Sequence, residues 1–212
     1  MEIKGLENKI IIIKDGKEYI NNINMIPDGF SVEIKGDRNI IKFHLPIHGK
    51  NNTIKINNKG TIVDIGSSSL LNSLCISCSG GFEQIIRIGN NTTIEGGLFI
   101  RVTYNAKIFI GNDCMFAHDI FIRATDAHSI IDKETKEIIN KPKHPIVIGD
   151  HCWIGQRCLI GKNAIIPANT IIGMGSIITK SFSKENTIIA GNPARIIKEN
   201  IEWDRRDIIN ME

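Results

Sequence analysis

The fold of this chain is decided by residues 148–179, IGDHCWIGQRCLIGKNAIIPANTIIGMGSIIT, in which isoleucine recurs at every sixth position. A small residue stands four positions after each of the first five isoleucines, and glycine directly follows most of them. The isoleucines are Ile148, Ile154, Ile160, Ile166, Ile172 and Ile178, and the small residues are Cys152, Cys158, Ala164, Thr170 and Ser176. A period of six matches neither a helix nor a single strand, so the chain must turn regularly.

The same hexads occur upstream in two blocks, of which the second is displaced by four residues. The blocks contain Ile88, Ile94 and Ile100, and then Ile110, Phe116 and Ile122. Repetition of this kind indicates a solenoid. If each hexad is one side with isoleucine pointing inward, three sides close a coil of about 18 residues, and coils stack by parallel strand pairing about 4.8 Å apart. We expect glycine or asparagine at the corners to supply positive φ.

The composition favours a soluble cytoplasmic protein. Hydrophobic residues make up 42% of the 212 residues and aromatic residues 6%, which predicts a sizeable aliphatic core. A net charge of +3 is too small to indicate nucleic-acid binding. Five cysteines, an odd number, do not suggest a disulfide framework. No apolar run is long enough for a transmembrane helix, and the N-terminus lacks a signal-peptide pattern, so we expect no membrane insertion.

We divide the chain into an N-terminal cap at residues 1–33, a β-helix at 34–190 and a C-terminal segment at 191–212. The cap should contain a hairpin around Asp15-Gly16. Residues 124–147 are polar, contain two prolines and interrupt the hexads, and long loops in compact domains are usually functional or disordered. Isoleucines in the last segment have helical spacing, which predicts a short helix over 198–209. The expected class is therefore all-β, a parallel β-helix with a protruding loop and a C-terminal helix.

Four motifs occur in the order found in the hexapeptide-repeat acyltransferases. They are a loop histidine in TDAHSI (125–130), a Trp-Ile-Gly coil at Trp153, GMGS (173–176) followed by Thr179-Lys180, and GNPAR (191–195). Each motif alone is weak, but their order and spacing are specific. Over about residues 85–203 the chain resembles this superfamily, and within it the sugar and polysaccharide O-acetyltransferases. The resemblance implies a left-handed parallel β-helix, a homotrimer, and acetyl-CoA bound in the groove between neighbouring solenoids.

The resemblance also implies acetyl transfer from acetyl-CoA to a hydroxyl of a bacterial capsule or lipopolysaccharide sugar, with His128 as general base. Imidazole has an unperturbed pKa near 6.5, and general-base catalysis contributes roughly 10²–10⁴-fold. His128 follows Ile122 by six residues, so an unbroken coil would bury it among aliphatic side chains at a high cost. We therefore expect the chain to leave the coil at 124–127 and present the imidazole outward. Direct transfer is favoured because no cysteine or serine has an evident partner base.

Three further residues are candidates near this histidine. Asp126 either orients the imidazole, as carboxylates do for catalytic histidines, or is a solvated loop acid. Trp153 either walls the acceptor site, donates its indole N–H to the thioester oxygen, or packs at the subunit interface. His118 precedes the loop by a few residues and is a candidate substrate contact, with a structural role as the alternative.

The resemblance implies two sets of residues that bind the acetyl donor, acetyl-CoA. Cationic side chains suit the phosphates, and glycines and neighbouring residues leave the backbone accessible to the pantetheine arm. The cations are Lys180, Arg195 and Lys198, and the residues along the arm are Gly173, Met174, Gly175 and Thr179. The family often has alanine at the position of Met174. The resemblance also implies a backbone N–H near Gly155 that stabilises the oxyanion.

Arg101 and Arg123 suggest an acidic acceptor. Each follows the inward isoleucine of corresponding hexads, and their spacing of 22 residues equals one coil plus the four-residue displacement. They should stack on one face, where paired guanidinium groups suit a carboxylate. Two solvated arginines are the alternative.

Other functional classes were compared with the acetyltransferases. A metal-dependent hydratase on this fold would need closely spaced histidines that the sequence lacks, and we expect no metal site. Cys114, Cys152 and Cys158 occupy small inward positions, and Cys75 and Cys78 form a single CxxC, short of a zinc site. A non-enzymatic solenoid would not carry the 124–147 loop. An antibiotic O-acetyltransferase and an amino-sugar N-acetyltransferase remain alternatives among the enzymes.

Overall fold

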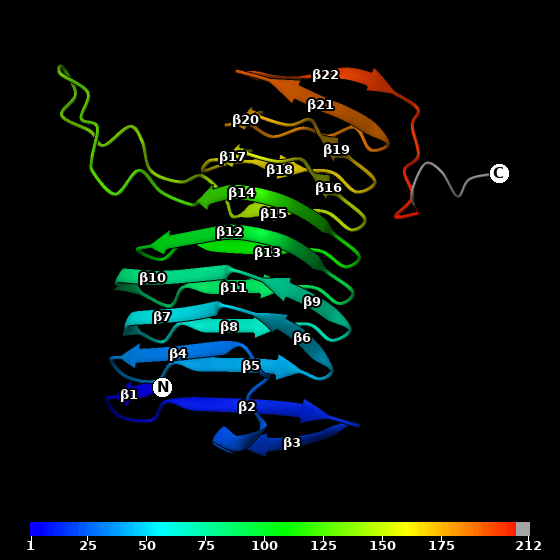
Figure 1. Cartoon of the computed structure of the whole chain (residues 1–212). Coiled ribbons are helices and arrows are strands. Elements are labelled where there is room, and N and C mark those ends of the chain that lie inside the picture. The colour runs from blue at the N-terminus through cyan, green and yellow to red at the C-terminus, as the bar shows by residue number, and fades with distance from the viewer. Residues whose placement is uncertain (207–212) are drawn as a thin grey trace.

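The computed structural model describes residues 1–206 and shows a parallel β-solenoid (Figure 1). Its strands form a 14-stranded and an 8-stranded sheet. The larger sheet contains β1 Glu2–Lys4, β4 Phe30–Lys35, β6 Ile47–Lys50, β7 Asn52–Lys59, β9 Ser69–Asn72, β10 Leu74–Phe82, β12 Thr93–Thr103, β14 Met115–Arg123, β16 Trp153–Ile154, β17 Leu159–Ile160, β19 Ile171–Ile172, β20 Ile177–Ile178, β21 Thr187–Gly191 and β22 Ala194–Glu199. The smaller sheet contains β2 Lys9–Lys14, β3 Lys17–Ile20, β5 Ile40–His44, β8 Ile62–Ile65, β11 Ile85–Ile88, β13 Lys107–Ile110, β15 Ile146–Ile148 and β18 Ile165–Ile166. One short 3₁₀ helix, Ile23–Met25, lies between β3 and β4.

The coil has three sides, as the hexads predict. Strand β14 is long enough to turn a corner, since its first part pairs with β16 and its last part pairs with β17, while β15 and β18 form the third side. Ile122 lies opposite Ile160, and Ile160 lies opposite Ile178, 18 residues further along the chain. Upstream coils are longer, because Ile100 lies opposite Ile122 at a spacing of 22. The inward isoleucines are buried, which confirms the predicted β-helix.

The corners of the coil differ from the expectation in which residue has a positive φ. Positive φ falls on the third residue after the inward isoleucine, as at Asn91 (55°), Asp113 (55°) and Asn163 (62°), and not on the glycine that directly follows the isoleucine. That glycine is required by close packing of successive coils. A Cβ on Gly149 would come 2.5 Å from the backbone nitrogen of Ala168. Asparagine therefore supplies the conformation, and glycine allows the coils to approach.

The two ends of the solenoid are closed by antiparallel hairpins. The β2–β3 hairpin turns at Asp15 and Gly16, as predicted. Parallel pairing already begins with β1 and β2, ahead of residue 34, where the sequence suggested that the coils start. None of the helices within residues 1–206 has the length and apolar character required to cross a bilayer.

At the C-terminal end, the β21–β22 hairpin replaces much of the expected helix. Residues 198–199 belong to β22, and residues 200–206 are not helical, so the prediction is wrong for 198–206. Residues 207–209 lie outside the described part. The last coil leaves an open strand edge, and pairing with it satisfies the backbone of a segment rich in isoleucine. This tertiary pairing outweighs the helical spacing of the isoleucines.

Candidate functional site

The long loop leaves the solenoid after β14 and returns to it at β15, as predicted (Figure 1). It extends as an arm, in which Ile131 and Ile138 form an antiparallel bridge. His128 lies near the root of this arm, at the corner between the second and third sides of the coil. The sequence therefore placed the histidine correctly outside the core, and its side chain is exposed.

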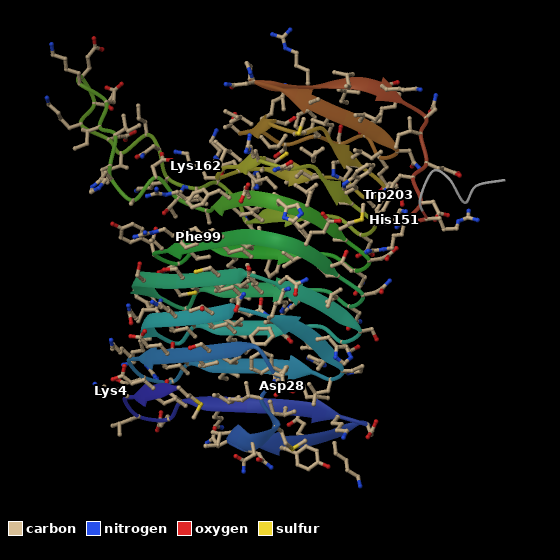
Figure 2. The ribbon with its side chains drawn as sticks, in the orientation of Figure 1. Lys4, Asp28, Phe99, His151, Lys162 and Trp203 are labelled. Atoms are coloured by element: carbon tan, nitrogen blue, oxygen red, sulfur yellow. The ribbon has the colours of Figure 1, made fainter. Side chains whose placement is uncertain are left out.

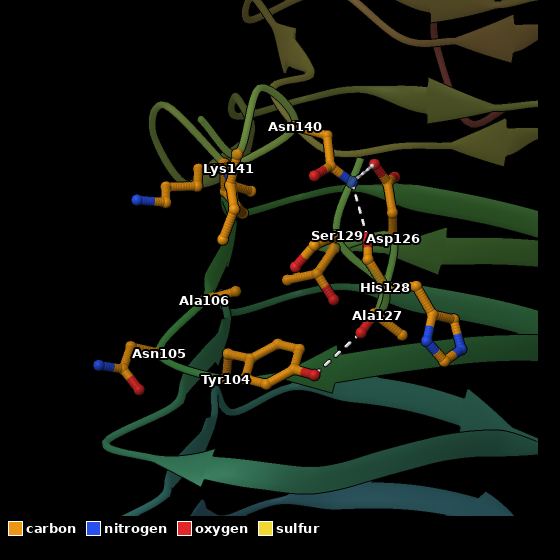
Figure 3. A pocket seen from close by; sticks show the side chains of 12 residues that line it. Tyr104, Asn105, Ala106, Asp126, Ala127, His128, Ser129, Asn140 and Lys141 are labelled. Atoms are coloured by element: carbon orange, nitrogen blue, oxygen red, sulfur yellow. Dashed lines mark hydrogen bonds between the residues drawn. The ribbon is translucent and has the colours of Figure 1, made fainter. Parts of the chain in front are cut away.

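A pocket of about 530 Å³ lies at the root of the loop, between the arm and the preceding coil (Figure 3). His128 lines it together with Tyr104, Ser129 and Asn140. Ala127, directly before the histidine, has a φ of 67°, a conformation that costs non-glycine residues energy and is often found at functional sites. Its carbonyl accepts a hydrogen bond of 2.9 Å from the Tyr104 hydroxyl. This backbone conformation turns the imidazole outward.

Asp126 contacts other partners than the expected imidazole. Its Oδ2 accepts a hydrogen bond of 2.8 Å from Asn140 and forms an ion pair with the ammonium group of Lys162. The Lys162 hydrogen bond, followed by that from Asn140, holds the pKa of Asp126 below its usual range. In Figure 3 the imidazole of His128 points away from this carboxylate. The structure therefore does not give Asp126 the role of orienting the histidine ring.

Arg101 and Arg123 are register partners on β12 and β14, which confirms the predicted stacking. Arg123 donates from Nε to the Thr125 carbonyl at 2.9 Å, so it lies at the start of the loop. Arg101 is exposed on the neighbouring strand. Two guanidinium groups thus flank the root of the loop that carries His128.

The other two candidate side chains lie at different parts of the triangle. His118 sits opposite Gly96 at the corner between the first and second sides, and its Nε2 is 3.2 Å from a Glu95 carboxylate oxygen. Trp153 begins the first side, is 38% exposed, and has its ring 6.0 Å from that of Trp203. Figure 2 shows Trp203 on the opposite side of the solenoid from Lys162, the partner of Asp126. One chain therefore does not bring Trp153 and His128 together.

A cluster beside Trp153 was not anticipated from the sequence. The Trp203 ring stacks on His151 with centroids 4.1 Å apart, and its indole N–H donates to the His151 carbonyl at 2.9 Å. Nδ1 of His151 lies 2.6 Å from Asp113, and Nε2 lies 3.1 Å from the Trp203 carbonyl. Arg205 donates to Asp113, Thr93 and two backbone carbonyls. The only signal in the sequence was a tryptophan followed closely by two arginines after the last coil.

Burial raises the pKa of Asp113 in this cluster, but hydrogen bonds from His151 and Arg205 outweigh burial, so its pKa lies below the usual value. Both ring nitrogens of His151 lie within hydrogen-bond distance of an oxygen, Asp113 Oδ2 for Nδ1 and the Trp203 carbonyl for Nε2. The C-terminal segment is thereby fastened to the corner before Trp153.

The residues considered for acetyl-CoA are spread along the upper coils. Gly155, Gly173, Met174 and Gly175 lie at the corner that follows Trp153, and Thr179 and Lys180 lie one side further on. Arg195 and Lys198 are exposed on β22. Gly175 has a φ of 71° and open space around it, whereas a Cβ on Gly173 would come 2.8 Å from that of Ala190. The Gly155 N–H already donates to the Ile172 carbonyl at 2.8 Å, so this group is not available to stabilise an oxyanion.

The cysteines are placed as structural residues. Cys114, Cys152 and Cys158 are buried in the core. Cys78 points inward, where burial raises its pKa to about 12, while Cys75 lies on the outer face of the same strand. Within residues 1–206 there is no group of three or more histidine, cysteine, aspartate or glutamate residues that could hold a metal ion.

Comparisons with known proteins agree with this arrangement. No protein-family model matches the chain. A polysialic acid O-acetyltransferase of Neisseria meningitidis is 35% identical over 203 residues, which cover 96% of this chain and 88% of that protein. Another polysialic acid O-acetyltransferase, from Escherichia coli O1:K1 / APEC, is 45% identical over 120 residues, which span 57% of this chain but only 38% of that protein. The crystal structure of the polySia-specific acetyltransferase NeuO matches with a TM-score of 0.83 at 28% identity, covering 98% of this chain and 89% of that chain.

Proposed function

The chain belongs to the hexapeptide-repeat O-acetyltransferases of the capsular-polysaccharide type, and from this we propose that it transfers the acetyl group of acetyl-CoA to a hydroxyl of an acidic capsular glycan. Two relatives are named for polysialic acid, a polymer with one carboxylate in each residue. The paired guanidinium groups of Arg101 and Arg123 support an acceptor of this kind. We place the reaction in the cytoplasm.

One observation carries the proposal: His128 is exposed beside a pocket and next to this arginine pair. A sugar hydroxyl is too weak an acid to react unaided near neutral pH. The His128 imidazole takes the hydroxyl proton as the oxygen attacks, and then gives it to the sulfur of the departing CoA thiolate, which leaves as the thiol. Acetyl-CoA supplies the activated thioester carbonyl. With both substrates held together the attack is effectively intramolecular, which lowers the barrier by roughly 7–11 kcal/mol.

The site requires a second copy of the chain, in a homotrimer. His128 and Trp153 lie on different sides of one solenoid, as the placement of their neighbours Lys162 and Trp203 shows. If solenoids pack side by side, the loop of one chain reaches the first side of the next, and Trp153 of that chain completes the site. The groove between them then also contains the exposed Met174 and Lys180, which suit acetyl-CoA.

The test is the steady-state kinetics of His128→Ala with acetyl-CoA and polysialic acid, measured by thiol release. We expect kcat to fall by about 10²-fold or more with KM for acetyl-CoA nearly unchanged, because a general base acts in the transition state. His48→Ala, at an exposed position on β6 far from the loop, is the matched control and should behave like the parent. Full activity of His128→Ala would overturn the assignment, if activity is lost instead in His118→Ala or in His144→Ala, the other histidine of the 124–147 loop.

A further inference from the structure

The imidazole of His128 is held in place only through its backbone. In the described residues no hydrogen bond reaches either ring nitrogen, so nothing fixes the ring directly. The main chain, in contrast, is bound on both sides. Tyr104 donates to the carbonyl of Ala127 at 2.9 Å, and the side chain of Asn140 donates to the carbonyl of His128 at 2.8 Å. The position of the general base therefore depends on these backbone contacts.

Asn140 joins the two stems of the loop. Its Nδ2 donates to Asp126 and to the His128 carbonyl, each at 2.8 Å (Figure 3). Its Oδ1 accepts from the Ile130 N–H at 2.8 Å. The side chain thus binds the segment that contains the histidine at three places. All of these contacts are internal to the loop, so by themselves they do not fix the loop against the solenoid.

Lys162 connects this network to the solenoid. It lies at the corner between β17 and β18, one coil after the loop begins. Its ammonium group pairs with Asp126 Oδ2 and donates to the Asn140 carbonyl at 2.9 Å. One cation therefore holds the outgoing and the returning stem together. The side chain of Lys162 is only 23% exposed, so its charge is partly removed from water and the pair is screened less than a surface salt bridge.

The conformation of Ala127 makes such support necessary. A positive φ is unfavourable for alanine relative to an extended or helical conformation. Without external contacts the peptide before His128 would relax, and the imidazole would change direction. Displacement of a catalytic group by about 1 Å can cost roughly 10²-fold in rate.

We propose that Lys162, acting through Asp126 and Asn140, is a positioning residue for His128. The proposal rests on the proposed function, since it assumes that His128 is the general base. Lys162 touches neither substrate nor the imidazole; it fixes the two stems of the loop to the coil that follows. Asp126 thereby has a defined role, different from the orientation of the histidine ring that the sequence suggested.

The experiment compares Lys162→Met with Lys162→Arg, which keeps the charge and the donors. For Lys162→Met we expect kcat to fall roughly ten- to hundredfold with KM for acetyl-CoA unchanged, and faster hydrogen–deuterium exchange in residues 126–140. Lys162→Arg should retain much of the parent's kcat and much of its slow exchange in residues 126–140. In a His128→Ala background, Lys162→Met should lower kcat no further, because the group that it positions is gone. Lys35→Met removes a lysine–carboxylate pair far from the loop and is the matched control.

The outcomes separate this proposal from the proposed function. Unchanged exchange of the loop in Lys162→Met would overturn the proposal, and so would faster exchange with unchanged kcat. A further loss of kcat in the His128→Ala background would show that Lys162 acts independently of the histidine and would also overturn it. If His128→Ala keeps full activity, the proposed function fails, whereas loss in His128→Ala alone with a fully active Lys162→Met refutes only the positioning role.

Discussion

Two corners of this solenoid fasten a non-repetitive segment by similar means. At the loop corner, Asp126 forms an ion pair with Lys162 of another coil. At the C-terminal corner, Asp113 forms an ion pair with Arg205 of the C-terminal segment. Each corner also contains a histidine, but in different states. His128 has no hydrogen bond to its ring within residues 1–206, whereas both ring nitrogens of His151 are engaged.

We interpret this difference as two uses of the same side chain. A general base needs a free nitrogen lone pair, and the role proposed for His128 is compatible with a corner that fixes the backbone and leaves the ring unbound. At the C-terminal corner both ring nitrogens of His151 contact an oxygen and an indole stacks on the ring, which suits a histidine that holds a segment. We therefore expect substitutions at the loop corner to change kcat, and substitutions at the C-terminal corner to change local order.

The largest expected effect at the C-terminal corner is that of Arg205→Met. The guanidinium donates to Asp113, Thr93 and two backbone carbonyls, and a charge-assisted hydrogen bond contributes about 1.5–3 kcal/mol. We expect hydrogen–deuterium exchange in residues 200–206 to increase roughly a hundredfold or more, while exchange in residues 126–140 stays as in the parent. An equal increase in both segments would remove the distinction between the corners.

The next effect concerns the acceptor beside the loop corner. Replacing Arg101 or Arg123 with Gln should raise KM for polysialic acid about tenfold and leave KM for acetyl-CoA unchanged, because one charge-assisted hydrogen bond to a carboxylate is lost. Added salt should raise KM for polysialic acid more in the parent than in the variants, because it screens the charge that the variants lack. If both variants have the parent's KM, the arginines are solvated, and a neutral sugar becomes the better acceptor.

The smallest effect is the loss of protection at both corners in acid. The pKa values of Asp113 and Asp126 both lie below the ordinary 3.8, so each carboxylate stabilises its segment at neutral pH and loses that effect only as pH falls through its lowered pKa. The protection factors of residues 126–140 and of residues 200–206 should therefore fall once the pH drops below the ordinary aspartate value. Constant protection of either segment in acid would show that its carboxylate does not hold it.

Some of these features were readable from the sequence. The hexads predicted the solenoid because inward isoleucines must recur once per side, and the same phase placed His128 outside the core and Arg101 opposite Arg123. The partner of Asp126 was not readable, because Lys162 follows it by 36 residues and the loop hides how many residues separate the coils. The C-terminal helix was predicted wrongly over 198–206, since isoleucine spacing carries no information about the open strand edge of the last coil. For the same reason the cluster of Trp203 and His151 was missed.

His128 and Trp153 lie on different sides of one chain, and from this separation we propose that two copies form each site. The direct test is to mix His128→Ala and Trp153→Ala chains in equal amounts, dissociate and reassemble them, and measure acetyl transfer to polysialic acid. Each variant alone should be nearly inactive. In a cyclic trimer about one quarter of the interfaces would combine an intact histidine with an intact tryptophan, so the mixture should recover about a quarter of the parent activity. Recovery of none of the activity, with trimers assembled normally, would contradict the account, because both residues would then act from the same chain.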